Sequence, residues 1–508
     1  MPFARSFCGS AAVTIDSSPT DPATTAGDPP IYRQIYWQVR NGIESGTLKP
    51  GDRVPSVRAL AKELGIARGT VETAYAVLNG EGWIQSRGQA GTVVTPGLAT
   101  RRQAGPRPAG PREAEPAPGC PAPGSDAALE SDLPMWPRPK TPMPLQMGLP
   151  ALDAVPRKLW ARLGARCLRG MRLHDLSYPA TAGLDALRET TAAYLQVSRG
   201  LHCTPSQVFI TSGYHQSMQV ATSAVLSPQD AVWVEDPGYP PTRALLAQFG
   251  MDWRAVPVDE QGLDVAAGQV LAPQARAAVV TPAHQSPLSL TLSPARRQAL
   301  LAWAAEGERW IVEDDYDGEY RYVSRPLPAL ASRDTAGRVL YAGTFSKVLF
   351  PGLRLSYLVV PPALVPRVER VHALLGAGAP WLTQATLALF MSEGHFARHI
   401  QRMRRLYTQR RSDMAAALDA ALGPGLGLRV EPQPGGMHMV LRLPAGYDDR
   451  ALALRLREAG LYAQPLSSWS SLPGAPLGLL MSFTNVADRE QADALAARMR
   501  LLLRPEVV

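Results

Sequence analysis

A lysine flanked by hydroxyl side chains follows the apolar run Val339–Gly343 in the segment VLYAGTFSK, and Arg354 lies seven residues beyond Lys347. A lysine amine forms a Schiff base with an aldehyde, which is how proteins hold pyridoxal phosphate (PLP). Thr344 and Arg354 supply a hydroxyl and a guanidinium that can bind a phosphate dianion. A lone Ser-Lys pair at a strand end is far more often a surface feature, so this prediction depends on companion motifs.

Three further motifs have the chemistry that a PLP site needs. In the acidic stretch Glu313–Asp317, a buried carboxylate would keep a pyridine nitrogen protonated, and Tyr316 would donate to the phenolic oxygen of the ring. Gly213 and Tyr214 open a helical stretch, whose free N–H groups and positive dipole end favour phosphate. Tyr239, in EDPGYPP, supplies a ring that can stack on a cofactor. The plainer interpretations are a solvated acidic loop, a common glycine turn and a packing tyrosine.

Short apolar runs alternate with helical patterns from about residue 145 onward, at residues 232–235, 277–281, 310–314, 339–343 and 355–360. One helix is predicted after Ser293, a favourable N-cap, with Pro294 at the first helical position. Strand–helix alternation predicts a largely parallel sheet covered by helices, an α/β fold. Because such sheets bind ligands at the carboxyl ends of their strands, the polar clusters after these runs are expected to meet there.

The pattern near the N-terminus is that of a helix-turn-helix with a wing. Ser56–Gly65 predicts a short amphipathic helix with a Ser cap and a Gly stop, and Arg68–Leu78 predicts a second helix after a tight turn. Trp83–Val94 predicts a small β-hairpin, the wing. The alternative is a small helical domain with ordinary surface arginines.

Four residues of this module are candidate DNA contacts. Near the start of the second helix, Arg68 and Thr70 would face the major groove, while Arg58 and Arg87 would reach phosphates or the minor groove. The net charge of +8 permits such binding, but residues 31–100 contribute eight Lys+Arg against five Asp+Glu, so charge does not locate the site. The densest basic run, Arg398–Arg411, predicts a solvated, partly ion-paired helix, with a second DNA contact or a dimer surface as alternatives.

Length and composition divide the 508 residues into several parts. We predict a disordered tail over 1–30, a DNA-binding domain over 31–97, a Pro-rich linker over 98–144 and an α/β domain over 145–508, whose small C-terminal subdomain begins near 390. No apolar run is long enough for a membrane helix, and no secretory signal is evident. The four cysteines are scattered, so no zinc or other metal site is predicted, and a reducing cytoplasm fits best.

Both modules resemble known families. The segment from PIYRQIYWQVRNG to LNGEGWI resembles the winged helix-turn-helix of the GntR superfamily. The motifs VEDPGYP, TPAHQSP, VEDDYDGEYRY and GTFSKVLFPGLRLSYLV resemble the fold type I aminotransferases. Together they make the chain similar to the MocR/GabR subfamily of GntR regulators, over about residues 31–97 and 145–508.

The resemblance implies a role for each motif residue. It implies that Lys347 carries the internal aldimine of PLP, that Asp314 pairs with the pyridine nitrogen and that Tyr316 contacts the phenolic oxygen. From the residues alone, Asp314 and Asp315 remain equivalent choices. The further implied roles are ring stacking by Tyr239, phosphate binding by Gly213, Tyr214, Thr344 and Arg354, and DNA contacts by Arg58, Arg68 and Thr70.

Several positions depart from the family patterns. Ala67 replaces the usual Ser or Thr cap, which should weaken that helix start by about 1 kcal/mol, and Gly69 and Glu72 replace side chains that contact DNA in some relatives. The family's HQ.PTG loop reads HQSPLSL at residues 284–290. Leu480 stands where aminotransferases usually carry the arginine that grips a substrate carboxylate. Arg243 is a possible substitute, although loop arginines are mostly solvated.

These features predict a PLP-dependent transcriptional regulator. It would bind a double-stranded DNA operator as a homodimer, domain-swapped by resemblance, and sense an amine, an amino acid or a B6 vitamer through Lys347. Leu480 disfavours the first alternative, an active aminotransferase with an appended DNA module. Retention of the cofactor residues disfavours the second, a winged-helix repressor that has lost PLP.

Overall fold

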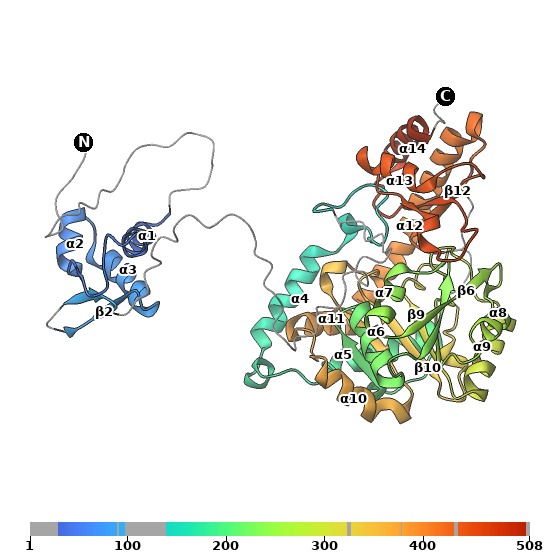
Figure 1. Ribbon diagram of the computed structural model, residues 1–508, viewed down its shortest axis with the longest axis horizontal. Coiled ribbons are helices and arrows are strands. Elements are labelled where there is room, and N and C mark those ends of the chain that lie inside the picture. The colour runs from blue at the N-terminus through green and yellow to red at the C-terminus, as the bar shows by residue number, and fades with distance from the viewer. Residues whose placement is uncertain are drawn as a thin grey trace, which may run out of the picture. The chain divides into compact units, whose positions relative to one another are not determined.

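The computed structural model describes residues 29–88, 91–96, 139–322, 327–376, 378–430 and 435–503. The chain forms two compact units, Met1–Pro123 and Gly124–Val508 (Figure 1). Most of the predicted tail over 1–30 and of the predicted linker over 98–144 lies outside the described residues, so those boundaries remain predictions. Among the described helices, none combines the length and apolar character that spanning a membrane requires.

The described part of the first unit contains three helices and a small sheet: α1 (Ile31–Glu44), β1 (Arg53–Val54), α2 (Val57–Leu64), α3 (Arg68–Gly80), β2 (Ile84–Ser86) and β3 (Thr92–Val94). Helix α1 is not among the elements predicted above. Its buried Ile35 and Ile43 share one apolar core with Val71 and Leu78 of α3. The burial of this stripe explains why a segment without a side-chain cap is helical.

The predicted helix-turn-helix and wing are confirmed. Ser56 caps α2, because its side chain accepts a hydrogen bond from the backbone N–H of Ala59 at 3.2 Å, and Gly65 ends α2 in the left-handed conformation. As predicted, Ala67 makes no side-chain cap at the start of α3. The wing strands pair antiparallel, and β3 also pairs with β1, which gives the strand order β1-β3-β2.

The second unit is built around an eight-stranded sheet of order β4-β11-β10-β9-β8-β5-β6-β7. Its strands are β4 (Val208–Thr211), β5 (Ala231–Asp236), β6 (Asp252–Asp259), β7 (Gly262–Leu263), β8 (Ala277–Val280), β9 (Trp310–Asp315), β10 (Val339–Thr344) and β11 (Ser356–Val359). All five predicted apolar runs are strands. The run at 355–360 differs in direction, because β11 lies antiparallel to both β10 and β4.

Helices cover both faces of this sheet: α4 (Arg157–Gly170), α5 (Asp185–Arg199), α6 (Tyr214–Val225), α7 (Pro240–Gln248), α8 (Val265–Leu271), α9 (Pro294–Glu306), α10 (Val365–Leu374) and α11 (Trp381–Ser392). Successive strand residues point to opposite faces. Val312 of β9 therefore packs in the core beneath α6, α7 and α10. Its neighbour Ile311 packs in the core beneath α8 and α9. The result is a three-layer α/β/α architecture (Figure 1), as predicted.

A smaller subdomain completes the second unit (Figure 1). It contains α12 (His395–Leu426), β12 (His438–Arg442), α13 (Asp449–Glu458), β13 (Gln464–Pro465), β14 (Gly478–Ser482) and α14 (Arg489–Leu503), with the strand order β12-β14-β13. Non-helical backbone at Pro424 and Gly425 interrupts the end of α12. Leu145 is fully buried in this core, and its carbonyl accepts a hydrogen bond from the N–H of Ser482 at 3.0 Å. This contact ties residues before α4 to the C-terminal sheet.

Candidate cofactor and DNA-binding sites

The sheet topology brings the predicted cofactor residues to one edge. Strands β10, β9, β8 and β5 are parallel neighbours, so their carboxyl ends lie together. Strand β4 runs in the same direction as β10, because both are antiparallel to β11. Gly213 follows β4, Lys347 follows β10, and Arg354 precedes β11, so all three lie at that edge. This is where an open α/β sheet places its ligand.

Lys347 lies in the loop after β10 and is half-buried. Its Nζ donates a hydrogen bond to the carbonyl oxygen of Gly148 at 2.8 Å. Gly148 has a φ of 82°, and a Cβ there would lie 2.8 Å from the Lys347 amine. The glycine therefore allows the main chain to approach the amine closely. Gly148 was missed from the sequence, since it lies 199 positions from Lys347 and belongs to no motif.

Asp314 lines a pocket together with Tyr214, Tyr239 and Thr281. Its side chain is buried, and no hydrogen bond is found between its carboxyl and another described residue. Burial, followed by the charges of Asp315 and Glu235, raises the pKa of Asp314 well above its usual value, while the nearby Lys347 lowers it. An unpartnered carboxyl in such a pocket can accept a hydrogen bond from a protonated ring nitrogen.

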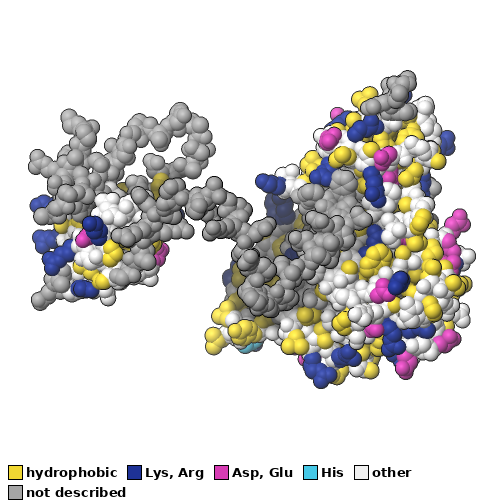
Figure 2. Space-filling view, in the orientation of Figure 1, with side chains coloured by type: hydrophobic (Ala, Val, Ile, Leu, Met, Phe, Trp, Pro, Cys, Tyr) yellow, Lys and Arg dark blue, Asp and Glu magenta, His cyan; other side chains and the backbone are white. Residues whose placement is uncertain are grey.

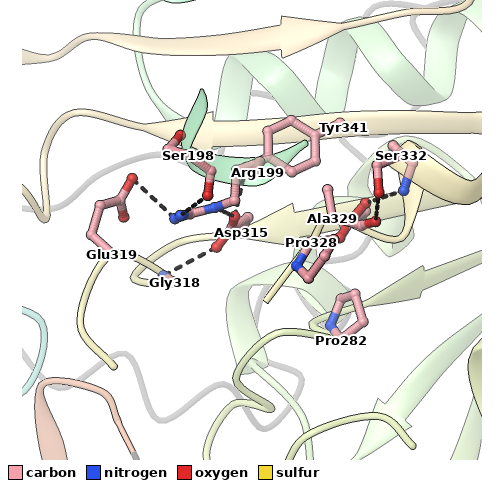
Figure 3. A network of polar contacts seen from close by, with 12 residues as sticks. Ser198, Arg199, Pro282, Asp315, Gly318, Glu319, Pro328, Ala329, Ser332 and Tyr341 are labelled. Carbon is pink, nitrogen blue, oxygen red and sulfur yellow. Dashed lines mark hydrogen bonds and ion pairs between the residues drawn. The ribbon is translucent and has the colours of Figure 1, made fainter. Parts of the chain in front are cut away.

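Asp315 is already occupied by structural partners. Its carboxylate forms a buried ion pair with Arg199, accepts a hydrogen bond from the Tyr341 hydroxyl at 2.6 Å, and accepts another from the Gly318 N–H at 3.1 Å. Figure 3 shows Arg199 between Asp315 and Glu319, and the second ion pair measures 3.1 Å. The Arg199 charge holds the pKa of Asp315 below its usual value despite the burial. Arg199 was also missed from the sequence, because its partners are remote in the chain.

Tyr316 belongs to a buried polar group beside Asp314. Its hydroxyl lies 2.9 Å from Nδ1 of His284, and the same nitrogen lies 3.0 Å from Oδ1 of Asp317. Burial and the Asp317 charge raise the pKa of Tyr316 well above its usual value, so the phenol remains protonated. The tyrosine can therefore donate a hydrogen bond, which its predicted contact with the phenolic oxygen of a cofactor requires.

The two aromatic candidates are neighbours. The ring of Tyr239 lies 5.8 Å from the ring of Tyr214 and 5.8 Å from that of Trp469. The Tyr214 hydroxyl is 2.6 Å from Oγ1 of Thr242. Tyr239 and Tyr214 both line the pocket that contains Asp314, so each can face a ring bound there.

The residues predicted to bind phosphate form a set of donors. Gly213 precedes α6, has a φ of 117°, and a Cβ there would lie 3.0 Å from the guanidinium of Arg354. Oγ1 of Thr344 lies 2.9 Å from Oγ of Ser356 and accepts a hydrogen bond from the Ser346 N–H at 3.1 Å. A helix N-terminus, a guanidinium and a hydroxyl suit a phosphate dianion. Together with Lys347 and Asp314, this donor set fits PLP.

Glu235 is a further residue of the pocket that was not predicted. Its carboxylate accepts a hydrogen bond from the N–H of Thr281 at 3.1 Å and another from the Thr281 hydroxyl. Burial raises its pKa to about 7. Its position at the end of an apolar run could have marked Glu235 as a site residue. Other acidic residues also follow apolar runs, so this position alone did not single it out.

The position of the missing carboxylate clamp is apolar. Leu480 is fully buried in β14, where it pairs with Val440 and Gln464. Arg243 lines the pocket but has partners within the fold, and the expectation of a solvated loop arginine is wrong. It lies in α7 with 11% of its side chain exposed, 3.3 Å from Oδ2 of Asp236, and it donates to the carbonyl of Trp469 at 3.2 Å.

The candidate DNA contacts lie on the first unit. Arg58, Arg68 and Arg87 are exposed, and Thr70 is half-buried in the first turn of α3. The guanidinium of Arg68 lies 3.5 Å from the carboxylate of Glu72. Figure 2 shows Lys and Arg side chains gathered on the side where Figure 1 places α2. An exposed second helix flanked by cations suits a DNA groove.

The basic run Arg398–Arg411 lies in α12, and several of its arginines bind the body of the second unit. Arg404 donates to the carbonyl of Glu319 at 2.6 Å, and Arg402 donates to that of Ala154. Arg410 is buried and pairs with Asp153 at 2.5 Å. These three cations have partners within the fold, which favours a structural role for this face of α12.

Comparisons with known proteins identify the family of each unit. Residues 31–94 match the family described as "Bacterial regulatory proteins, gntR family", and residues 156–477 match "Aminotransferase class I and II". The alpha-aminoadipate aminotransferase LysN of Thermus thermophilus is similar in structure, with a TM-score of 0.64 and 27% identity over 71% of this chain and 92% of that one. The kynurenine aminotransferase of Pyrococcus horikoshii is also similar in structure, with a TM-score of 0.65 and 25% identity. The match covers 75% of this chain and 93% of that one. The second unit thus has the fold of the PLP-dependent aminotransferases.

Full-length relatives are regulators. The probable rhizopine catabolism regulatory protein MocR of Rhizobium meliloti is 34% identical over 443 residues, 87% of each chain. TauR of Rhodobacter capsulatus is 35% identical over 86% of this chain and 89% of its own length. The pyridoxine biosynthesis regulator PdxR of Corynebacterium glutamicum is 30% identical over 89% of this chain and 92% of its own length. The class is therefore a DNA-binding regulator with a PLP-dependent aminotransferase-like domain.

The chain belongs to the MocR-type regulators of the GntR family. The predicted fold, the predicted cofactor and the predicted function as a PLP-dependent DNA-binding regulator are confirmed. The names of these relatives do not support the alternative of an aminotransferase with an appended DNA module.

Proposed function

We propose that the second unit is a sensor, and that a ligand arriving at Lys347 changes how the winged helix binds its operator. The observation that carries this proposal is that Lys347 and Asp314 follow or end neighbouring parallel strands at one sheet edge, close enough for the Lys347 charge to lower the pKa of Asp314. The ligand is an amine, an amino acid or a B6 vitamer. Regulation requires that the ligand bind the two DNA-affinity states of the protein differently.

Each site residue has a part in this proposal. PLP supplies a reactive aldehyde and an electron-withdrawing pyridine ring. Lys347 would hold its aldehyde carbon, and Asp314 would accept a hydrogen bond from the protonated ring nitrogen. Tyr316 would donate to the phenolic oxygen and Tyr239 would stack on the ring. The phosphate would be bound by the donor set described above, namely Gly213, Tyr214, Thr344 and Arg354.

Leu480 stands where aminotransferases usually carry the arginine that binds a substrate carboxylate. This difference supports sensing rather than sustained turnover. Leu480 offers no charge-assisted contact to orient an amino acid carboxylate, and Arg243 is paired with Asp236. An amine ligand that took the place of Lys347 on the cofactor aldehyde would release the Lys347 amine, which would then gain a charge. We infer that this change of charge beside Asp314 is the signal transmitted to the DNA-binding unit.

We further propose that the protein works as a cytoplasmic homodimer that reads two operator half-sites. An exposed apolar group supports self-association: Leu168, Leu173, Leu176 and Tyr178 are 53%, 86%, 70% and 98% exposed. Such a cluster of apolar side chains is typical of an interaction surface. A symmetric dimer would match two-fold related half-sites. The domain-swapped arrangement implied by the resemblance remains part of this proposal.

The test compares the visible absorption of the purified wild type, Lys347→Ala and Lys158→Ala, before and after borohydride. Lys158 is an exposed lysine of α4 and serves as the control. We expect a cofactor band in the wild type and in Lys158→Ala that borohydride removes, and its loss in Lys347→Ala. We also expect amines to alter operator affinity only in the two proteins that keep the band. A protein that stays colourless with added PLP would overturn the proposal.

A further inference from the structure

Two side chains beside the candidate cofactor site share one imidazole nitrogen. Nδ1 of His284 lies 2.9 Å from the Tyr316 hydroxyl and 3.0 Å from Oδ1 of Asp317. His284 opens the HQSPLSL loop, whereas Asp317 follows the end of β9. The side chain of Asp317 is fully buried, and that of His284 is 7% exposed. An imidazole nitrogen either donates or accepts, so the position of its proton decides what both partners do.

The carboxylate fixes the position of that proton. A carboxylate oxygen only accepts, so Asp317 at 3.0 Å requires a proton on Nδ1 of His284. Without this proton, two lone pairs would face each other across a buried contact, and the carboxylate would lack a donor. A carboxylate that holds one tautomer of a histidine in this way is a recurring feature of functional sites.

The other nitrogen of His284 offers no competing place for the proton. Nε2 is buried and makes no hydrogen bond within the part of the chain that the structure describes. A buried N–H without an acceptor costs about 1–3 kcal/mol. Gly436 closes this side of the ring, because a Cβ there would lie 2.4 Å from Nε2. A proton on Nε2 would thus gain no acceptor, whereas a proton on Nδ1 has Asp317.

Tyr316 then keeps its own hydrogen for a ligand. Burial and the Asp317 charge raise the pKa of Tyr316 well above its usual value, so the phenol stays protonated. A hydrogen bond with the Ser286 hydroxyl acts in the opposite direction on this pKa, as a donor does. The Tyr316 oxygen therefore faces two donors, His284 Nδ1–H and Ser286, and its hydrogen is not taken up by His284.

A second histidine does not compete for Asp317. The ring centroid of His438 lies 5.7 Å from that of His284. Burial lowers the pKa of His438 to about 4, so it is neutral near pH 7, and its Nε2 lies 2.8 Å from the Pro287 carbonyl oxygen. The other titratable or charged groups around His284, Tyr316 and Asp317 are Asp314, Glu235, Arg321 and Lys347.

We propose that His284 and Asp317 are positioning residues for Tyr316: Asp317 keeps the imidazole proton on Nδ1, so that Tyr316 donates its hydrogen to the phenolic oxygen of PLP. This inference rests on the proposed function, because it adds two residues to the same sensor site. Donation to the phenolic oxygen stabilises its negative charge most when the nitrogen that joins Lys347 to the cofactor has lost its proton. His284 and Asp317 thereby lower the pH at which the cofactor band changes.

The test records the cofactor band of the PLP-loaded full chain against pH. Tyr316→Phe removes the donor and should raise the midpoint by about one pH unit. Asp317→Asn should also raise it, because the proton is no longer held on Nδ1 and Tyr316 turns its hydrogen to His284. Loss of a negative charge alone would lower the midpoint, so the sign separates the two effects. Asp185→Asn, with its side chain 78% exposed on α5, is the matched control and should leave the midpoint unchanged.

Two further measurements isolate the positioning role. In the double variant of Tyr316→Phe and Asp317→Asn, the midpoint should rise no further than in Tyr316→Phe alone, because Asp317 acts through the Tyr316 hydroxyl. Nitrogen-15 NMR of histidine-labelled wild type without PLP should find His284 protonated on Nδ1 and not on Nε2, with His284→Phe to identify its signals. The NMR measurement decides the inference even where Asp317→Asn does not fold.

The outcomes distinguish this inference from the sensor proposal. A midpoint that falls or stays unchanged in Asp317→Asn overturns the inference and leaves the sensor proposal standing. A His284 proton found on Nε2 has the same consequence. A wild type that shows no cofactor band after addition of PLP overturns the sensor proposal, and the inference with it.

Discussion

Asp314 and Asp315 are consecutive residues of β9, yet their carboxyl groups serve opposite faces of the sheet. Asp315 is bound to Arg199, Tyr341 and the Gly318 N–H, whereas Asp314 lines the pocket without a hydrogen-bond partner among the described residues. The alternation of a strand imposes this division. It separates a carboxyl that stabilises the fold from one that is available to a ligand. The sequence Asp-Asp alone does not predict which of the two has which role.

The division predicts different effects for two matched substitutions. Asp314→Asn should leave the free energy of unfolding of the cofactor-free protein unchanged or slightly higher, because it removes an unpartnered buried carboxyl. The same change should weaken PLP binding by about 10- to 100-fold, the value of a charge-assisted hydrogen bond. Asp315→Asn should lower the free energy of unfolding by about 3–5 kcal/mol, because it leaves the Arg199 charge less compensated in the interior.

Denaturant unfolding without cofactor and PLP titration by absorbance check both values. Each variant serves as the control of the other, since the substitution is chemically identical. Loss of stability in Asp314→Asn together with normal stability in Asp315→Asn would contradict the assignment.

The buried carboxyl of Glu235 predicts a pH dependence of stability. Its pKa rises from 4.5 to about 7 on folding because it is buried. Between these values the folded protein retains a proton that the unfolded chain has lost. The contribution of Glu235 is therefore fully present below pH 4.5 and is lost as the pH rises to about 7, by about 3 kcal/mol at most.

Glu235→Gln removes this proton and keeps the hydrogen-bonding shape. The stability of the wild type minus that of Glu235→Gln should fall between pH 4.5 and 7 and remain constant above pH 7. Denaturant unfolding at half-unit pH intervals measures this difference. Glu260→Gln, an exposed change, is the control and should reproduce the wild-type profile. A difference that rises with pH would show that the sign of the shift is wrong.

Local signals predicted much of the fold. The Ser293 cap is formed, with its side chain accepting from the Arg296 N–H at 3.3 Å, and the five apolar runs are strands, because burial and capping act within a few residues. Long-range contacts could not be predicted in this way. Arg199 and Asp315 are 116 positions apart, and Gly148 and Lys347 are 199 apart. No local sequence pattern around the glycine or the arginine predicts such a distant partner.

The two helix caps of the first unit predict opposite effects on its stability. Ala67 already has the extended backbone of an N-cap, with φ −64° and ψ 138°, but it lacks a side-chain acceptor. Ala67→Ser should therefore stabilise the first unit by about 1 kcal/mol. Ser56→Ala should destabilise it by a similar amount, because the hydrogen bond from the Ala59 N–H at 3.2 Å is lost. Thermal unfolding measures both, and equal effects of the same sign would contradict the capping argument.

The DNA-binding face predicts two separable defects. Arg58→Ala should remove one phosphate contact, so that the slope of log K against log salt concentration becomes shallower by about 1, with sequence preference retained. Arg68→Ala should instead relax discrimination between bases by about 1–3 kcal/mol, because Arg68 stands at the start of the recognition helix.

Binding is measured at several salt concentrations on a duplex selected by this protein from a random pool. Arg254→Ala is the control, because Arg254 is exposed on the second unit and paired with Asp252 at 2.6 Å. If it weakens binding as much as Arg58→Ala does, the effect is one of overall charge and the assignment of α2 and α3 as the DNA-binding surface is wrong.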